Sequence, residues 1–330
     1  MINESVPRHA PVRTSSPIVV LTGATGFVGR HLSAHFQAKG WTVRGIVRRA
    51  TDPRLLLEGV VPVLADHDDE ERIGGGLRDA YAVVHLAARV HRPRETAAPW
   101  RERYRMDNVR PTETLVRAAV KQGVRRFVFV STVRIHGAAS TTVCRADDAP
   151  APPDPYAASK LEAEQVVRGA APELEWDVVR PTFVYGKGGK GNFERLVRLT
   201  RLACRFPLPL DGFTGLRSVM YVENLASLLL TCVEHPAAAR RVLLAADDPP
   251  IATNRLIRLV GEALGCRPRL FHCTPTLLRA VASLFGRADD LSRLADDFVV
   301  DTTPLSSVLE WRSPVPIEEA LRRSVAVAAT

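Results

Sequence analysis

The sequence lacks any long uninterrupted run of apolar residues and any closely spaced pair of cysteines. No stretch approaches the roughly 18 apolar residues that a membrane-spanning helix requires, although 46% of the 330 residues are hydrophobic. The five cysteines (144, 204, 232, 266 and 273) are odd in number and never spaced Cys-x-x-Cys. This spacing predicts neither a disulfide framework nor a metal site. We therefore expect a cytoplasmic protein with reduced thiols, no metal and no transmembrane segment.

Aromatic residues are also few, at 6% of the chain, and the basic residues form no long runs. The net charge is +9, but the longest basic runs are pairs such as Arg48-Arg49. A dispersed basic surface with few aromatics does not favour nucleic-acid binding. It fits a protein whose ligand is an anionic small molecule better, so we expect no nucleic-acid partner.

Five apolar runs rich in Val and Ile predict strands, at residues 18–21, 43–47, 60–64, 82–86 and 127–130. Helical spacing appears between them at 28–38, 108–121 and 157–168. Alternating strands and helices predict a doubly wound parallel sheet, the Rossmann type of α/β fold.

The pattern changes after residue 180, where loops rich in Gly and Pro mix with short helices at 224–232 and 253–264. We expect a flexible tail at 1–16, a dinucleotide-binding domain at 17–180 and a smaller substrate-binding region at 181–330. A strand-like run at 241–245 suggests that part of 217–250 rejoins the first domain.

Three glycines follow the first predicted strand, at positions 23, 26 and 29. In this context backbone N–H groups and the dipole of the following helix can hold a pyrophosphate. The spacing is Gly-x-x-Gly-x-x-Gly rather than Gly-x-Gly-x-x-Gly, and a glycine-rich turn without a ligand is the alternative.

Arg48 follows the second predicted strand, where a site selective for NAD usually offers Asp or Glu to the ribose. An arginine can pair with a 2′-phosphate, so NADP(H) is favoured and NAD(H) remains possible. Arg44 and Arg54 are candidate helpers, and Asp66 after the third strand is a candidate acceptor for the adenine amino group. The alternative for Arg48 is a solvated surface residue.

Tyr156 and Lys160 are four residues apart on one face of a predicted helix. Only five of the 45 basic residues are lysines, so an amine at position 160 runs against the composition of the chain. A nearby ammonium can stabilise a phenolate, and lowering the pKa of a tyrosine from about 10 to neutrality requires roughly 4 kcal/mol. This pair predicts acid–base chemistry beside a nicotinamide cofactor.

Two further polar residues lie near this pair in the predicted fold. Thr132 follows the fifth strand, at the edge where open α/β sheets bind ligands, and its hydroxyl could bond the substrate oxygen; the alternative is a cap on a turn. Asn108 begins the preceding helix and could hold a water or a backbone group, or could merely cap the helix.

Taken together, these motifs resemble extended short-chain dehydrogenases/reductases of the NAD-dependent epimerase/dehydratase type. The resemblance covers about residues 18–320. It includes the glycine turn, His85-Leu-Ala-Ala88, Ser131-Thr132, Tyr156 with Lys160, Arg180-Pro181, Val184-Tyr185-Gly186, Arg217-Ser218 and Val222-Glu-Asn-Leu-Ala226.

The resemblance implies a role for each matching residue. Thr132, Tyr156 and Lys160 would be catalytic, with Tyr156 as the acid/base. The cofactor would be contacted by Gly23, Thr25, Gly26, Phe27, Val28, Gly29, Arg48, Asp66, Leu86, Ala87, Ala88, Asn108, Tyr156, Lys160 and Pro181. Of these, Arg48 departs from the family, because it stands where epimerases that retain NAD have an acid. The substrate would be contacted by Thr132, Tyr156, Asn192, Arg217 and, on weaker grounds, Arg293. A homodimer through the helices around Asn108 and Tyr156 is expected from the resemblance as well.

Within that family, 190–193 and 207–210 are similar to members that act on UDP-hexoses or UDP-N-acetylhexosamines for surface polysaccharides. The resemblance thus implies hydride transfer at carbon 4 of a UDP-linked sugar. A 4-keto reductase is slightly favoured by Arg48, and a 4-epimerase that retains NAD is the alternative. Val133 and Arg134 follow Thr132 and provide no Asp-Glu pair for a dehydratase. A non-catalytic nucleotide-binding protein on the same fold is the more distant alternative.

Overall fold

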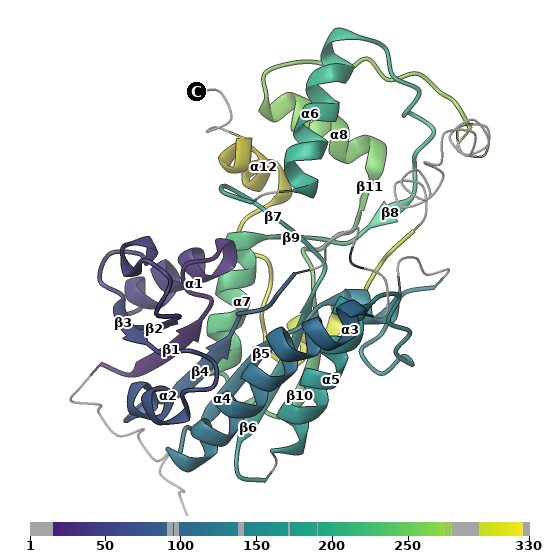
Figure 1. The fold of residues 1–330 in the computed structure, drawn as a ribbon. Helices are drawn as coiled ribbons and strands as arrows, with labels where there is room; N and C mark the ends of the chain where they lie inside the picture. The colour runs from purple at the N-terminus through teal and green to yellow at the C-terminus, as the bar shows by residue number, and fades with distance from the viewer. Residues whose placement is uncertain are drawn as a thin grey trace, which may run out of the picture.

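A computed structural model describes residues 16–90, 95, 99–137, 142–170, 172–189, 191–274, 276, 278 and 297–325. A seven-stranded parallel sheet forms its centre (Figure 1), in the order β10-β6-β5-β4-β1-β2-β3. The strands are β1 (Ile18–Thr22), β2 (Thr42–Val47), β3 (Val61–Leu64), β4 (Ala82–His85), β5 (Arg126–Val130), β6 (Glu175–Pro181) and β10 (Arg241–Ala245). The predicted doubly wound fold is confirmed.

Helices cover both faces of the sheet. On one face α1 (Phe27–Ala38) packs against α7 (Val222–Glu234), and on the other α4 (Arg110–Lys121) packs against α2 (Glu70–Leu77) and α5 (Pro155–Gly169). Two separate apolar cores fill these layers. A central strand is therefore buried on both sides, which explains why the strands appear as continuous apolar runs.

The strand order reverses between β1 and β4, which places the ends of these two strands together. Thr22 at the end of β1 is in register with His85 at the end of β4. In open α/β sheets the ligand crevice forms at this reversal, outside the carboxyl ends of the strands.

The described part of the C-terminal region lies above the sheet in Figure 1 and contains small two-stranded sheets packed with helices. β7 (Phe183–Tyr185) pairs with β9 (Val219–Tyr221), and β8 (Leu216–Arg217) pairs with β11 (Ile251–Ala252). The helices are α6 (Asn192–Arg205), α8 (Thr253–Ala263) and α12 (Ile317–Val325). β10 is paired with β6, so the chain returns to the central sheet after β9 and α7.

The shorter elements connect these parts of the fold. They are α3 (Pro99–Tyr104), α11 (Thr303–Ser307), a π-helical turn η2 (Arg105–Val109), and the 3-10 turns η1 (Pro53–Leu55), η3 (Val133–His136) and η4 (Pro236–Ala238). None of the helices in the described ranges has the length and apolar character needed to span a bilayer.

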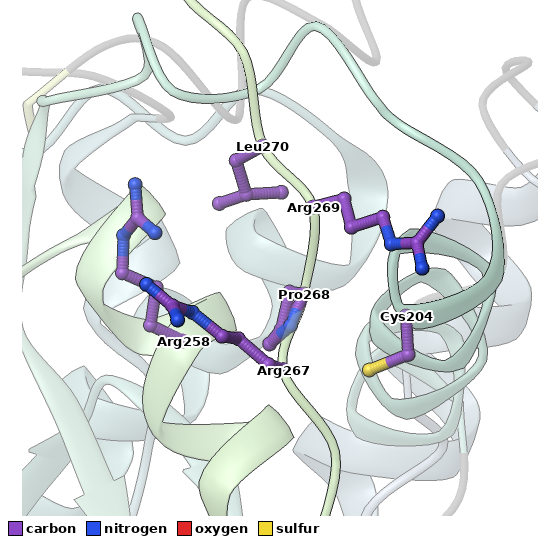
Figure 2. Close-up of a pocket in the computed structure, with 6 residues that line it drawn as sticks. All are labelled: Cys204, Arg258, Arg267, Pro268, Arg269 and Leu270. Carbon is purple, nitrogen blue, oxygen red and sulfur yellow. The ribbon is translucent and has the colours of Figure 1, made fainter.

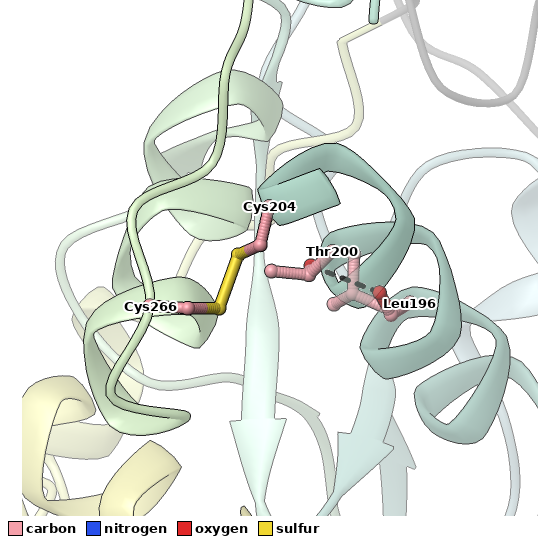
Figure 3. Close-up of a disulfide and its surroundings, with 4 residues drawn as sticks. All are labelled: Leu196, Thr200, Cys204 and Cys266. Carbon is pink, nitrogen blue, oxygen red and sulfur yellow. Dashed lines mark hydrogen bonds between the residues drawn. A yellow bond between two sulfur atoms is a disulfide. The ribbon is translucent and has the colours of Figure 1, made fainter. Parts of the chain in front are cut away.

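One disulfide joins α6 to the turn after α8 (Figure 3), between Cys204 and Cys266. The expectation of reduced thiols is wrong for this pair. The two residues are 62 apart in the sequence, but α6 and α8 pack side by side and bring their Cα atoms to 6.1 Å. Sequence spacing gives no sign of such a long-range contact. Cys144, Cys232 and Cys273 are free thiols.

Candidate active site

The glycine turn folds tightly between β1 and α1 and leaves no room for side chains. Gly23 has a φ of +69°, and a Cβ there would lie 2.9 Å from the backbone N of Ala87. A Cβ on Gly29 would lie 2.2 Å from the carbonyl oxygen of Gly23. Gly26 precedes α1 and offers no capping side chain, so the first N–H groups of the helix remain available. The turn fits a bound pyrophosphate.

Thr22 and His85 fix the turn against β4 through a chain of hydrogen bonds. The Thr22 hydroxyl accepts from the backbone N–H groups of Leu86 at 3.2 Å and Ala87 at 3.1 Å, and lies 2.6 Å from His85 Nδ1. On the other side of the ring, His85 Nε2 is 3.0 Å from the hydroxyl of Thr112.

The donors and acceptors in this chain assign the tautomer of His85. The Thr112 hydroxyl donates to the carbonyl of Asn108 at 2.7 Å, so it accepts from Nε2–H of His85. His85 Nδ1 then accepts from Thr22. Burial lowers the pKa of His85 to about 3, with Lys160 contributing in the same direction, so the ring is neutral. Sequence reasoning assigned His85 no role, although it begins the His85-Leu-Ala-Ala88 motif and is a polar residue in an apolar strand.

Arg48 and Arg49 follow β2, and the structure gives their side chains different environments. Arg49 is paired with Asp66 and Asp69, whereas Arg48 is exposed. Arg44 donates to the carbonyls of Gly76 and Arg78 at the end of α2. The other expected helper, Arg54, pairs with Asp52. Arg48 is the only one of the three arginines predicted for the cofactor ribose whose guanidinium has no partner among the described residues.

Tyr156 lies in the first turn of α5, and its position is fixed from both sides. Asp154 caps the helix by accepting from the backbone N–H of Ala157 at 2.9 Å, and it pairs with Arg134 at 2.5 Å. The Tyr156 hydroxyl is hydrogen-bonded to Thr132, which follows β5. Two of the three predicted catalytic residues are therefore in contact.

Burial raises the pKa of Tyr156 to about 12, with Asp154 adding to the shift and Thr132 opposing it. The protein alone therefore does not produce the lowered phenol pKa expected from the sequence. The physical reason is that desolvation disfavours the phenolate and that Asp154 adds a negative charge nearby.

Lys160 is buried beneath the site, with its ammonium 3.9 Å from the ring centroid of Phe129. Burial lowers its pKa to about 7, opposed by Glu164. In the part of the chain that the structure describes, no hydrogen-bond acceptor contacts this ammonium. A buried amine without an acceptor fits a ligand that brings oxygen atoms, such as the ribose of a dinucleotide.

Asn108 holds a backbone group, one of the two roles considered for it. Its Oδ1 accepts from the backbone N–H of Arg89 at 2.7 Å, and its Nδ2 donates to the Ser159 hydroxyl of α5 at 2.9 Å. It thus ties the segment after β4 to the helix that carries Tyr156 and Lys160.

A buried ionic cluster beside Tyr156 was not found from the sequence. Arg89 pairs with Glu95 at 2.7 Å, and the hydroxyl of Tyr104 donates to Glu95 at 2.7 Å. The ring of Tyr104 lies edge-on to that of Tyr156, 6.1 Å between centroids. The cluster supports one side of the catalytic ring.

The remaining predicted residues lie on several elements. Thr25 lies in the turn before α1, Phe27 and Val28 begin that helix, and Pro181 ends β6 beside Ala245 of β10. Asn192 is exposed at the first position of α6, and Arg217 is half-buried in β8. Ala88 follows the segment held by Thr22. Arg293 lies outside the described residues.

The chain matches the model of the NAD dependent epimerase/dehydratase family over residues 19–245. It is also 33% identical over 314 residues to a UDP-glucose 4-epimerase of Vibrio cholerae, covering 93% of this chain and 94% of that protein. The chain belongs to this family. The expected resemblance and the expectation of an NAD(P)-dependent enzyme are confirmed.

Other relatives include reductases. A 4-hydroxy-2-methyl-3-oxo-4-farnesyl-3,4-dihydroquinoline-1-oxide ketoreductase of Stigmatella aurantiaca is 28% identical over 269 residues, 80% of this chain and 78% of that protein. Among solved structures, MoeE5 in complex with UDP-glucuronic acid and NAD superposes with a TM-score of 0.71 at 25% identity, covering 93% of this chain and 97% of that chain. The family members that resemble this chain therefore include both epimerases and reductases.

Proposed function

We propose that this protein is a UDP-sugar 4-epimerase, which transfers a hydride from carbon 4 of a UDP-linked hexose or N-acetylhexosamine and returns it to the opposite face. The observation that carries the proposal is the hydrogen bond between Thr132 and Tyr156 at the ligand edge of the sheet, with Lys160 buried one helical turn along α5. The similarity of nearly the whole chain to a UDP-glucose 4-epimerase supports this reaction.

Each catalytic residue has a separate task. The nicotinamide cofactor, when bound, supplies the hydride acceptor and donor. Tyr156 removes the proton from the 4-hydroxyl as the carbonyl forms and gives it back when the carbonyl is reduced. Thr132 donates a hydrogen bond to the phenolate or to the same sugar oxygen. Lys160 holds the cofactor ribose through its amine.

Ligand binding must lower the pKa of Tyr156 from about 12 for this chemistry to run near neutrality. Each pKa unit corresponds to about 1.4 kcal/mol. Lys160 gains hydrogen-bond acceptors when the cofactor binds, which favours its charged form, and the ammonium then stabilises the phenolate. In this account the acid–base residue becomes active only in the loaded enzyme.

The substrate diphosphate is assigned to the C-terminal region. Arg217 would pair with the phosphates, because a guanidinium forms bidentate bonds with phosphate oxygens. Asn192 at the start of α6 would contact the uridine diphosphate, and Arg293 would add a further contact.

A 4-keto reductase is the second candidate, and Arg48 is the residue that favours it. Its exposed guanidinium is available for a 2′-phosphate, which would give a preference for NADP(H) over NAD(H). Asp66 is assigned to the adenine amino group. A reductase consumes the reduced cofactor, whereas an epimerase regenerates it in each turnover.

A homodimer through α4 and α5 is part of the proposal. A groove of about 380 Å³ runs between these helices and is lined by Val116, Val120, Val166 and Ala170 among others. A second copy of the chain would cover this apolar strip. Light scattering would show a dimer, and Val120→Arg would give a monomer.

We also propose that the protein works in the cytoplasm, where the nicotinamide cofactor and nucleotide sugars are available as substrates. Fractionating cells that express the full chain and following the protein by immunoblotting tests this location. Recovery of the protein in a periplasmic or secreted fraction would contradict it. The Cys204–Cys266 disulfide makes this test necessary, because disulfides persist mainly in oxidising compartments.

The proposed reaction is tested by denaturing freshly purified protein and identifying the released nucleotide. Sugar conversion is then followed at the absorbance band of reduced nicotinamide. Bound NAD with no net absorbance change during conversion supports the epimerase. An empty site that consumes NADPH only with a 4-keto sugar would establish the reductase, and sugar conversion by Tyr156→Phe at the wild-type rate would overturn both.

A further inference from the structure

A cavity of about 550 Å³ lies in the C-terminal region between α6, α8 and the segment after α8. Figure 2 shows three arginines around it, Arg258, Arg267 and Arg269, with Pro268 and Leu270. Arg258 is paired with Asp211 at 2.5 Å. Within the described ranges, no carboxylate pairs with Arg267 or Arg269, and both are exposed. The cavity therefore presents two uncompensated positive charges to solvent.

The exposed face of α6 continues this charge. Arg195, Arg198, Leu202 and Arg205 repeat at helical spacing and are exposed, while Phe193 and Val197 face the core. The helix contains one acidic residue, Glu194. α6 is thus a basic amphipathic helix whose polar face also carries an exposed leucine.

Backbone bonds and the disulfide join these two features into one surface. The N–H of Arg269 donates to the carbonyl of Ala203 at 2.7 Å, and the N–H of Leu208 donates to the carbonyl of Arg269 at 2.9 Å. The disulfide fixes Cys204 to Cys266 one residue before Arg267. The end of α6 and the segment 267–271 are therefore held side by side.

Large apolar side chains are exposed on the same surface. Phe206 is 59% exposed, Phe271 49% and Leu202 45%. Leu208 and Leu270 pack inward against the small core of this region. Because side chains alternate along an extended segment, Arg269 and Phe271 project outward. We call this surface, formed by Arg198, Leu202, Arg205, Phe206, Arg267, Arg269 and Phe271, the basic tip.

We infer that the basic tip docks the enzyme on an anionic lipid surface. Guanidinium groups pair with lipid phosphates, and each basic side chain near such a surface contributes about 1 kcal/mol, or about a fivefold gain in partition. Exposed Phe and Leu side chains between the arginines can enter the interface between headgroups and acyl chains. Duplex DNA, whose bases are stacked inside the helix, would not use these apolar groups. The inference concerns binding alone and does not depend on the proposed reaction.

The test is co-sedimentation of the full-length protein with vesicles of phosphatidylglycerol and phosphatidylcholine, or of phosphatidylcholine alone. We expect binding only to the anionic vesicles, weakening as salt is raised. Arg267→Gln/Arg269→Gln should lower the partition coefficient for anionic vesicles about thirtyfold. Phe206→Ser/Phe271→Ser should reduce the part of the binding that remains at high salt, because that part comes from the apolar side chains.

A matched control removes two exposed arginines elsewhere, as Arg78→Gln/Arg312→Gln. It carries the same change in net charge and should bind within about twofold to threefold of wild type. Thermal unfolding of all variants shows that they fold. Equal loss in the control and the tip variant would overturn the inference, as would equal binding to phosphatidylcholine. Binding of duplex DNA without binding of anionic vesicles would overturn it too.

Discussion

Thr22 and His85 are hydrogen-bonded at 2.6 Å across the two strand ends that border the cofactor crevice. The same Thr22 hydroxyl accepts from two backbone N–H groups of the segment after β4. One small side chain therefore bonds the buried His85 ring and two partly buried N–H groups, and it holds the glycine turn in place.

Replacing this hydroxyl should be costly. Thr22→Val keeps the shape but leaves His85 Nδ1 and the N–H group of Ala87 without a partner, while the N–H of Leu86 keeps the Thr22 carbonyl at 3.3 Å. We expect a loss of about 3 kcal/mol in the free energy of unfolding, since each buried unsatisfied group costs about 1–3 kcal/mol. Urea unfolding measures the loss. Thr22→Ser retains the hydroxyl and serves as the control; equal stability of the two variants would contradict the assigned role.

The fold could be predicted from the sequence because its signals are local. All five predicted strands and the three predicted helices of the first domain appear where the apolar periodicity places them, and the strand-like run at 241–245 pairs with β6. The helices α2 and α3 and the strand β6 were not predicted. The glycine turn after β1 could be predicted because its glycines repeat at a fixed spacing, and the structure shows that Gly23 and Gly29 have no space for a Cβ.

What could not be predicted depends on contacts between distant segments. Arg89, Glu95 and Tyr104 form a cluster only after the segment that follows β4 meets α3. Cys204 and Cys266 meet because two helices pack together. The pKa of Tyr156 depends on burial, which spacing on a helix does not reveal.

Lys160 should destabilise the protein when no cofactor is bound. Its pKa falls from 10.5 to about 7 on folding because of burial, which corresponds to about 5 kcal/mol as an upper limit. The unfolded chain binds the proton more tightly, so the cost is complete below pH 7 and declines as the pH rises toward 10.5. We expect cofactor-free Lys160→Met to be more stable than wild type, and inactive.

The difference in free energy of unfolding between cofactor-free wild type and Lys160→Met should shrink by about 2 kcal/mol between pH 7 and pH 9. Urea unfolding at several pH values measures it. A difference that does not vary with pH would show that the amine is not held in a desolvated site.

Tyr156→Phe tests the acid–base role. The variant should bind cofactor and sugar nearly as wild type, because the ring remains, while turnover falls about 10²-fold to 10⁴-fold. Thr132→Val should lower turnover less, because it removes one hydrogen bond to the phenol. Steady-state rates and a fluorescence titration of the cofactor separate the two effects. Loss of cofactor binding in Tyr156→Phe would assign the residue to binding instead.

The disulfide should stabilise the C-terminal region when it is oxidised. It closes a loop with a sequence separation of 62 residues, and a cross-link of that length is expected to contribute about 4 kcal/mol at most. A reducing agent should lower the melting temperature of wild type. The same agent should leave Cys204→Ser unchanged, and an equal shift in both proteins would contradict the assignment.

The most direct test of the proposed reaction is nuclear magnetic resonance of sugar conversion in D₂O. UDP-glucose, UDP-N-acetylglucosamine and UDP-glucuronic acid are each incubated with the enzyme and NAD. The account predicts that at least one is converted to its 4-epimer with hydrogen retained at carbon 4, because the hydride returns from the cofactor rather than from solvent. Deuterium at carbon 4, or no epimer from any of the three, would contradict it.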